Sequence, residues 1–324
     1  MKPFTQRLYR MLLCLGASAL AVAPAAAQQN WPERPIKALV GFSPGGVVDV
    51  MARAVLNELG TELGQSVVVE NKTGAGGSIS VAAAAAEPAD GYTLLVTSNF
   101  LLVNPVLDSS VKWTSDEFVP VGRYALSPSI LAAPPNAPYS TVKEFVEYAK
   151  ANPKLPFPDG GAGTTQTMGS LMLFREAGIE MESIYYKGAP PMIPDMAGGL
   201  LAVGMIPGTV AIPAIQGGRI KALAITGDKR ASALPDVPTI AEAGYPNATV
   251  VSWYGLHVRK GTPQPIIDRL AQALEKACAS EAVKKSLEAA GGEEAYQDTP
   301  AFAAFVQKES DRWLGLLKAR EAAK

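Results

Sequence analysis

The sequence predicts an α/β protein with two lobes, each a sheet flanked by helices, and three observations support this prediction. Short apolar segments typical of strands alternate with amphipathic helical segments, which favours parallel sheets covered by helices. The alternation restarts in the middle of the chain, near residue 141. Two extended segments, 127–138 and 249–258, connect the halves, so we expect the first lobe to be discontinuous and to include the C-terminal helices.

The N-terminus has the three parts of a secretory signal peptide. Three basic residues precede an apolar run from 11 to 23, and Ala25 to Ala27 form a small-residue cleavage site. The run is too short to cross a bilayer, which takes roughly 20 apolar residues. The sequence therefore predicts residues 1–27 as a signal peptide, cleavage after Ala27 and export to the periplasm. Cleavage removes Cys14, and Cys278 alone cannot form an internal disulfide.

The size and charge of the remaining chain limit its architecture and its partners. Residues 28–324 exceed the length at which a single core usually stops growing, so two domains are expected. The leader holds three of the 29 basic residues and none of the 30 acidic ones, which leaves a formal charge of −4. No nucleic acid partner is expected. An anion would have to be bound through local donors such as backbone amides and helix N-termini.

The first lobe opens with a predicted βαβαβ unit. A strand at 37–42 precedes a turn and a helix whose apolar residues Val48, Met51, Val55 and Leu59 share one face. A strand at 67–69, a glycine loop at 74–77, an alanine-rich helix from about residue 80 and a strand at 93–97 follow.

The second lobe repeats this order. Thr141 and Glu144 form a capping box that opens a helix ending near Pro153. A strand at 155–157 leads through a glycine loop into a helix from about residue 165, which Gly178 ends. Strands are expected at 183–186, 201–206 and 220–226.

The end of the chain is helical. After the extended segment 249–258, helices are expected up to 279, from 281 to 290, and from about 300 to 320. We therefore expect residues 28–128 and 252–324 to form lobe 1, and residues 129–251 to form lobe 2.

Three loops have the composition of an anion site. The turn from Phe42 to Gly46 links a strand to a helix N-terminus and can form a nest of free amides, with Asp49 holding amides or a water. The loop 161–166 supplies glycines, two hydroxyls and an amide, and 97–99 supplies further small polar groups. Ligands bind outside the carboxyl ends of strands in open parallel sheets, where all three loops are expected. The alternatives are a tight turn with Asp49 as a helix-start charge, and N-capping by Thr164 or Thr165.

The glycine loop 74–78 has a different predicted role. It lacks the Gly-Lys-Ser/Thr ending of a phosphate loop, which argues against nucleotide binding. We expect it to pack closely against the neighbouring loop and not to contact a ligand.

The sequence offers little for catalysis. His257 is the single histidine, and no Gly-x-Ser-x-Gly elbow is present, so a hydrolase would depend on that residue alone. Neither the cysteines nor the scattered carboxylates, such as Asp195 and Glu242, have metal-ligand spacing. We expect no enzyme activity, no metal and no cofactor.

Several segments together resemble the periplasmic receptors of tripartite tricarboxylate transporters, the TctC-like or Bug receptor family. The resemblance extends over essentially the whole mature chain. It lies in 31–36, in Phe42 to Gly46 with Asp49 and Ala52-Arg53, in 69–77 and 90–95, in 186–190 with Asp195, and in 234–244.

The resemblance implies a type II periplasmic binding protein fold that captures a small organic carboxylate in the cleft between the lobes by hinge closure. It implies delivery to the membrane permease subunits of a tripartite tricarboxylate-type transporter, and we expect a monomer. The ligand-binding residues expected from lobe 1 are Phe42, Ser43, Gly45, Gly46, Asp49, Ser98 and Asn99. Those expected from lobe 2 are Gly163, Thr164, Thr165, Gln166, Tyr186 and Asp195.

Two departures leave the ligand open. Thr167 stands where many relatives have histidine, and Ile184-Tyr185-Tyr186 stands where Val-Pro-Tyr is common. Aromatic acids, dicarboxylates, amino acids, nicotinate-like compounds and uncharged ligands all remain candidates. Two other functions also remain open, a receptor that signals to a membrane sensor kinase and a periplasmic hydrolase that uses His257.

Overall fold

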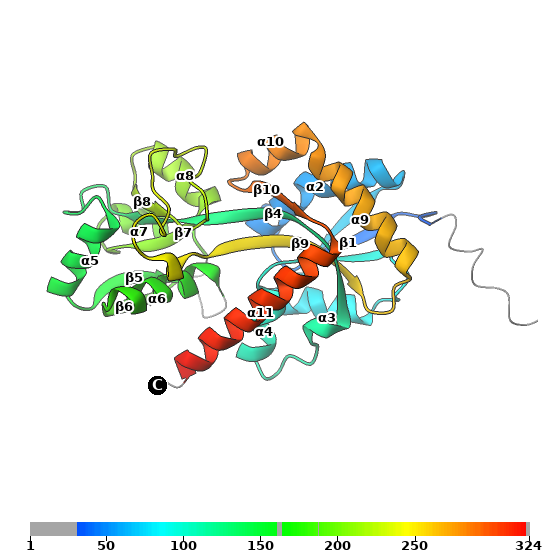
Figure 1. Cartoon of the computed structure of the whole chain (residues 1–324), viewed down its shortest axis with the longest axis horizontal. Helices are drawn as coiled ribbons and strands as arrows, with labels where there is room; N and C mark the ends of the chain where they lie inside the picture. The colour runs from blue at the N-terminus through cyan, green and yellow to red at the C-terminus, as the bar shows by residue number, and fades with distance from the viewer. Residues whose placement is uncertain (1–30, 161–163, 187, 322–324) are drawn as a thin grey trace, which may run out of the picture.

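The protein consists of two α/β lobes joined by long strands. The computed structural model describes residues 31–160, 164–186 and 188–321. The predicted signal peptide and Gly163 therefore lie outside the described residues. Figure 1 shows the lobes side by side, with strands β4 (Phe118–Ala133) and β9 (Val251–Arg259) running between them.

Strands of lobe 1 form most of an eight-stranded sheet. Its main path has the order β10-β4-β9-β3-β1-β2, and β1 pairs in parallel with both β2 and β3. This arrangement confirms the predicted βαβαβ unit. The elements of this unit are β1 (Ile36–Val40), α2 (Val47–Leu63), β2 (Val67–Asn71), α3 (Ser78–Ala86) and β3 (Thr93–Thr97). The chain then adds α4 (Phe100–Leu107) and enters β4.

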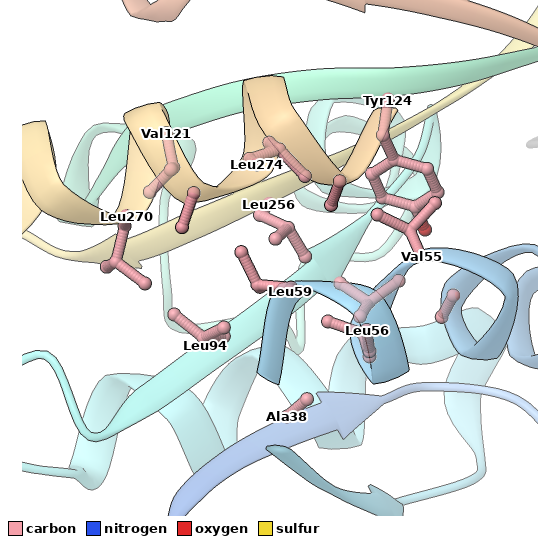
Figure 2. Close-up of a cluster of buried hydrophobic side chains, with 14 of the residues drawn as sticks. Ala38, Val55, Leu56, Leu59, Leu94, Val121, Tyr124, Leu256, Leu270 and Leu274 are labelled. Carbon is pink, nitrogen blue, oxygen red and sulfur yellow. The ribbon is translucent and has the colours of Figure 1, made fainter. Parts of the chain in front are cut away.

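The core of lobe 1 lies where the sequence pattern places it. Val55, Leu56 and Leu59 recur at helical spacing on α2 and pack on the strands, and Figure 2 shows them facing Leu270 and Leu274 of α9 (Gln264–Ala279). All five side chains are buried. Burial of this stripe, and not local propensity, is the main source of helix stability.

Lobe 2 is built around the second half of β4. There β4 pairs antiparallel with β7 (Gly204–Pro207) and β8 (Lys221–Ile225), while β5 (Leu155–Asp159) and β6 (Met181–Tyr185) form a parallel pair. The helices of this lobe are α5 (Val142–Ala151), α6 (Thr165–Ala177), α7 (Met192–Ala197) and α8 (Gly208–Gln216). Gly178 caps α6 in the left-handed conformation, as predicted.

The C-terminal elements complete lobe 1, where one strand joins the sheet and helices pack against it. They are α9, α10 (Glu281–Ala289), β10 (Glu293–Gln297) and α11 (Thr299–Glu321). Two apolar clusters drawn from residues 130–250 fill lobe 2, and a further cluster joins Met168 of α6 to Leu102 and Trp253. The lobe boundaries at 128/129 and 251/252 stay a prediction. No helix among residues 31–160, 164–186 and 188–321 is long and apolar enough to span a membrane.

The first connection between the lobes is a long strand. The segment 127–138, predicted to be an extended connection, has its first part inside the 16-residue strand β4. Proline cannot donate to a ladder, so it is tolerated in strands at edges and irregularities. Pro120 lies at a register shift, and Pro128 lies where β4 changes its partner from β9 to β8.

The predicted capping box of α5 allows a stability test. The Thr141 hydroxyl accepts a hydrogen bond from the Glu144 amide at 3.1 Å, while the Glu144 carboxylate accepts one from the Ser140 amide at 2.7 Å. Thr141→Ala should lower the free energy of unfolding by about 1 kcal/mol in urea denaturation. Lys143→Ala, at an exposed position of the same turn, is the control, and equal stability of the two variants would contradict the capping role.

Candidate functional site

Strand direction places the predicted loops between the lobes. β9 runs from lobe 2 into lobe 1, and because β3 is antiparallel to it and β1 is parallel to β3, the carboxyl ends of β1 and β3 point toward lobe 2. β4 runs the opposite way, so the carboxyl ends of β7 and β8 point toward lobe 1. β5 lies parallel to the β7 segment, with the Ala202 amide bonded to the Pro156 carbonyl at 2.8 Å. The loops after β1, β3, β5, β6 and β7 therefore meet at the interface of the lobes.

The loop after β1 leaves several amides free at the start of α2. Gly46 is the N-cap residue, and no side chain caps the helix. The Gly46 amide bonds to the Ser43 carbonyl at 3.0 Å, and Gly45 has a φ of 76°. The amides of the first helical turn have no partner within a helix, and the helix dipole adds positive potential there. The amides of Gly45 and Gly46 are thus already bonded, and the free amides at this point are those that begin α2. The anion nest of Phe42, Ser43, Gly45 and Gly46 stays a prediction.

Asp49 holds this loop through the Gly45 amide. Its carboxylate accepts hydrogen bonds from the Gly45 amide at 2.9 Å, from Arg53 Nε at 2.9 and 3.0 Å, and from Asn71 Nδ2 at 2.8 Å. Burial opposes its ionisation, but the bonds from Arg53, Asn71 and Gly45 outweigh burial and hold the pKa of Asp49 below its usual value. Both of its oxygens are engaged, so Asp49 acts on the loop and a contribution to binding would be indirect.

The loop after β3 brings a buried donor to the same edge. Ser98 and Asn99 are 8% and 3% exposed, and Asn99 stands at the start of α4. Its Nδ2 is buried without a hydrogen-bond partner, although the Ser98 hydroxyl donates to its Oδ1 at 3.3 Å. An unpaired buried donor costs about 1–3 kcal/mol, so this amide is a place where a ligand or water oxygen is expected.

The glycine loop 74–77 packs as predicted. A Cβ on Gly41 would lie 2.8 Å from the Cα of Gly77, and one on Gly77 would lie 2.9 Å from the Phe100 ring. Asn104 donates hydrogen bonds to the carbonyls of Ala75 and Gly76 at 3.4 and 3.0 Å. The loop supports its neighbours.

In lobe 2, Thr167 organises the loop after β5. Its hydroxyl bonds to the Asp159 carboxylate at 2.9 Å and accepts the Gly160 amide at 3.0 Å, while the Thr164 hydroxyl caps the Thr167 amide at 3.3 Å. The predicted N-capping by Thr164 is confirmed. The buried Thr165 follows at the first position of α6. Thr167 is fully buried and links the loop after β5 to the start of α6.

Gln166 turns toward the connecting strand. Its Nε2 donates to the Ser129 hydroxyl of β4 at 2.9 Å, so this donor is already used in the structure. The Ser129 amide in turn donates to the Thr226 hydroxyl at 2.8 Å. The loop after β5 is thereby tied to the strand that joins the lobes.

Tyr186 and Asp195 form a pair at the carboxyl end of β6. The phenol donates to Asp195 Oδ2 at 2.5 Å, and the Tyr186 amide donates to the Asp159 carbonyl at 2.9 Å. Burial, followed by the bond to Asp195 and its charge, raises the pKa of Tyr186 to about 12. The phenol therefore stays a donor at neutral pH.

The structure adds residues that the sequence did not single out. Asn71, at the end of β2, and Arg53 join the Asp49 network, and the loop after β7 brings Gly208 and Thr209 to the interface. The Thr209 hydroxyl oxygen is buried without a partner. Sequence reasoning found no signal for the loop after β7, because Thr209 is its single polar side chain and follows a proline and a glycine. Arg53, one helical turn after Asp49, was named only within the family resemblance, although its spacing allows an ion pair with Asp49.

His257 lies in the core of lobe 1. It is 1% exposed, packs against the Phe302 ring, and its Nδ1 is 2.8 Å from the Thr97 hydroxyl. Burial lowers the pKa of His257 to about 3. A general base needs a pKa near the working pH and an accessible nucleophile, and this site has neither feature.

Two surface hollows lie at the far ends of the lobes. One is lined by 57–67 at the end of α2, and the other by residues around Pro134 to Tyr139 and Ala197 to Gly199. Neither contains a predicted site residue. The interface loops remain the candidate site.

Comparison with known proteins identifies a family that this chain resembles over most of its length. A family model described as the tripartite tricarboxylate transporter family receptor matches residues 51–322. The UPF0065 protein in the tcbD-tcbE intergenic region of Pseudomonas sp. (strain P51) is 34% identical, over 95% of this chain and 93% of that protein.

Solved structures show the same fold. The periplasmic binding protein BugD superimposes with a TM-score of 0.76 at 31% identity, over 89% of this chain and 98% of that chain. R. palustris Rpa4515 with adipate superimposes with a TM-score of 0.79 at 29% identity, again over 89% and 98%. The predicted two-lobed periplasmic binding protein fold is confirmed.

Proposed function

Because the chain belongs to the tripartite tricarboxylate transporter receptor family, whose members are periplasmic solute-binding proteins, we propose that it captures a small organic carboxylate between its lobes. The proposed contacts from lobe 1 are the amides of the Phe42 to Gly46 loop with Ser98 and Asn99. Those from lobe 2 come from the loop 163–166 and from the Tyr186 and Asp195 pair.

The observation that carries this proposal is the unpaired Asn99 amide. It is buried at the start of α4, next to a loop whose own amides start α2 without a side-chain cap. Donors of this kind, held in place before the ligand arrives, bind a carboxylate without a charged partner. The relative that was solved with adipate supports the same ligand class.

Hinge closure is the proposed mechanism. β4 and β9 are the connections between the lobes, and rotation about them would bring the lobe 2 loops onto the ligand and exclude water. Gln166, bonded to Ser129 of β4, would couple the lobe 2 loop to that motion. We further propose that the chain is exported by its 1–27 leader, works as a monomer and presents its closed form to permease subunits of a tripartite tricarboxylate-type transporter.

A thermal-shift screen tests the ligand class. The protein is heated with paired compounds, each acid beside its amide, beginning with adipate and adipamide. A ligand that binds the native state raises the melting temperature by mass action, by an amount that depends on its concentration relative to Kd. We expect a rise with an acid that is absent with its amide.

Variants locate the site. Asn99→Ala should weaken binding of the acid about tenfold, since a hydrogen bond to a charged group is lost. Asn136→Ala, at an exposed position in lobe 2, should bind as the wild type does. A response to amides as strong as to acids, or full affinity in Asn99→Ala, would refute the proposed carboxylate site.

A further inference from the structure

The carboxylate of Asp49 presents an electrostatic problem for the proposed function. It is 2% exposed, lies in the first turn of α2 and bonds to Gly45 of the very loop that would receive an anion. An uncompensated negative charge at this position would repel the ligand carboxylate. The positive potential at the N-terminus of α2 would mainly stabilise the Asp49 carboxylate, and little of it would remain to attract a ligand anion.

Two residues outside the predicted site solve this problem. Arg53 Nε contacts both oxygens of Asp49 at 2.9 and 3.0 Å, and its Nη2 donates to Asn71 Oδ1 at 3.2 Å. Asn71 Nδ2 donates both to Asp49 Oδ1 and to the Phe42 carbonyl, each at 2.8 Å. Asn71 can do so because it pairs with Val40 at the last position of β1, directly before the loop.

Two bonds of this network reach the loop, and the others join its three side chains to one another. The Phe42 carbonyl accepts from Asn71 and the Gly45 amide donates to Asp49, so both ends of the turn are fixed. The amides that begin α2 donate to none of the three side chains. The network therefore fixes the loop and leaves these amides for a ligand.

Resting on the proposed function, we propose that Asp49, Arg53 and Asn71 form a charge-neutral brace behind the anion loop. Asn71 is a positioning residue that sets the orientation of the Phe42 to Gly46 turn. Arg53 is the counter-charge that lets this turn accept an anion above a buried carboxylate. The brace thus favours anionic over neutral ligands without any of its three side chains touching the ligand.

A charge cycle at positions 49 and 53 tests the counter-charge, with adipate as the probe and calorimetry as the readout. Arg53→Gln, at a side chain 46% exposed, leaves Asp49 uncompensated and should weaken adipate binding about tenfold at low salt. The loss should shrink as salt is raised, because exposed charge is screened. The double variant Asp49→Asn with Arg53→Gln removes both charges and should recover most of the affinity. A purely structural role for Arg53 predicts no recovery, and that result would overturn the counter-charge.

Asn71 is tested by hydrogen exchange, which needs no ligand. Asn71→Ala should speed amide exchange across 42–48 at least tenfold in the free protein and weaken adipate binding by a similar factor. Asn57→Ala, the same substitution at an exposed position of α2, is the control and should change neither. Unchanged exchange in Asn71→Ala, at an unchanged melting temperature, would overturn the positioning role.

The two proposals fail in different ways. If no acid binds the wild type, the carboxylate function is wrong, yet the exchange result still decides whether Asn71 orders the loop. If acids bind the wild type and Asn71→Ala equally, the function stands and the brace is wrong.

Discussion

Replacing Gly208 by valine is expected to weaken ligand binding about tenfold to a hundredfold, although Gly208 lies outside the proposed ligand contacts. Gly208 begins α8 of lobe 2, and a Cβ there would lie 3.0 Å from the Gly291 carbonyl oxygen and 3.1 Å from that of Pro128. Gly291 belongs to the turn between α10 and β10 of lobe 1. The lobes thus touch backbone to backbone at this point, and a side chain would wedge them apart.

The size of the effect follows from the cost of overpacking. Inserting methyl groups into a filled contact costs about 1–3 kcal/mol, which corresponds to roughly five- to 150-fold in an equilibrium constant. The cost applies to the arrangement in which the lobes meet, and the proposed hinge closure requires that arrangement for binding. Gly208→Ala should give a smaller loss in the same direction.

Affinity measurement and small-angle scattering together check this prediction. With saturating acid, Gly208→Val should keep a larger radius of gyration than the wild type. Gly315→Val is the control, because no atom lies within 4 Å of the position of its Cβ. A variant that melts earlier but binds and closes normally would show that the contact persists in every arrangement of the lobes.

The alternating elements could be predicted from the sequence because each buries one periodic face. Residues 93–97 and the face of α2 with Met51, Val55 and Leu59 lie where their patterns place them. Three elements were missed in part or in full. Only the end of β4 was predicted, as an extended connection, the acidic start of β10 hid a sheet edge, and Pro105 within α4 hid a short apolar helix. Strand pairing overrides the local signal in β4 and β10, and burial of apolar side chains overrides it in α4.

The positions of the candidate-site loops could be predicted from the sequence, but the hydrogen bonds that hold them could not. Glycines and hydroxyls after strands marked 42–46, 98–99 and 164–166, because the end of a parallel strand is where such residues can face a ligand. The pairing of Asn71 with Val40 depends on sheet register, and the bond from Gln166 to Ser129 depends on how β4 joins the lobes. Neither relation leaves a trace in residue spacing.

Acid should destabilise the fold through His257, by about 3 kcal/mol between pH 7 and pH 4. Burial lowers the pKa of His257 to about 3, against about 6.5 in an unfolded chain. The neutral ring therefore stabilises the fold above pH 6.5. That stability is lost as the pH falls from 6.5 toward 3, because the unfolded chain takes up a proton that the folded chain excludes, at about 1.4 kcal/mol per pH unit.

The surroundings of the ring explain why it excludes the proton. The Thr97 hydroxyl donates to the Gly255 carbonyl at 3.1 Å, so it accepts from Nδ1 of His257, which assigns the remaining lone pair to Nε2. The Phe302 ring covers the imidazole, and no described carboxylate pairs with it. A proton on Nε2 would create a buried cation without a counter-charge.

A variant with a side chain that does not titrate isolates this contribution from the carboxylates, which also respond to acid. His257→Gln keeps a donor for Thr97, and its free energy of unfolding, from urea titrations at pH 7, 6, 5 and 4, should fall less steeply than that of the wild type. The difference between the two slopes should approach one proton per molecule near pH 5. Parallel curves would mean that the folded chain protonates His257 as readily as the unfolded chain does, and that the imidazole is more accessible than its 1% exposure implies.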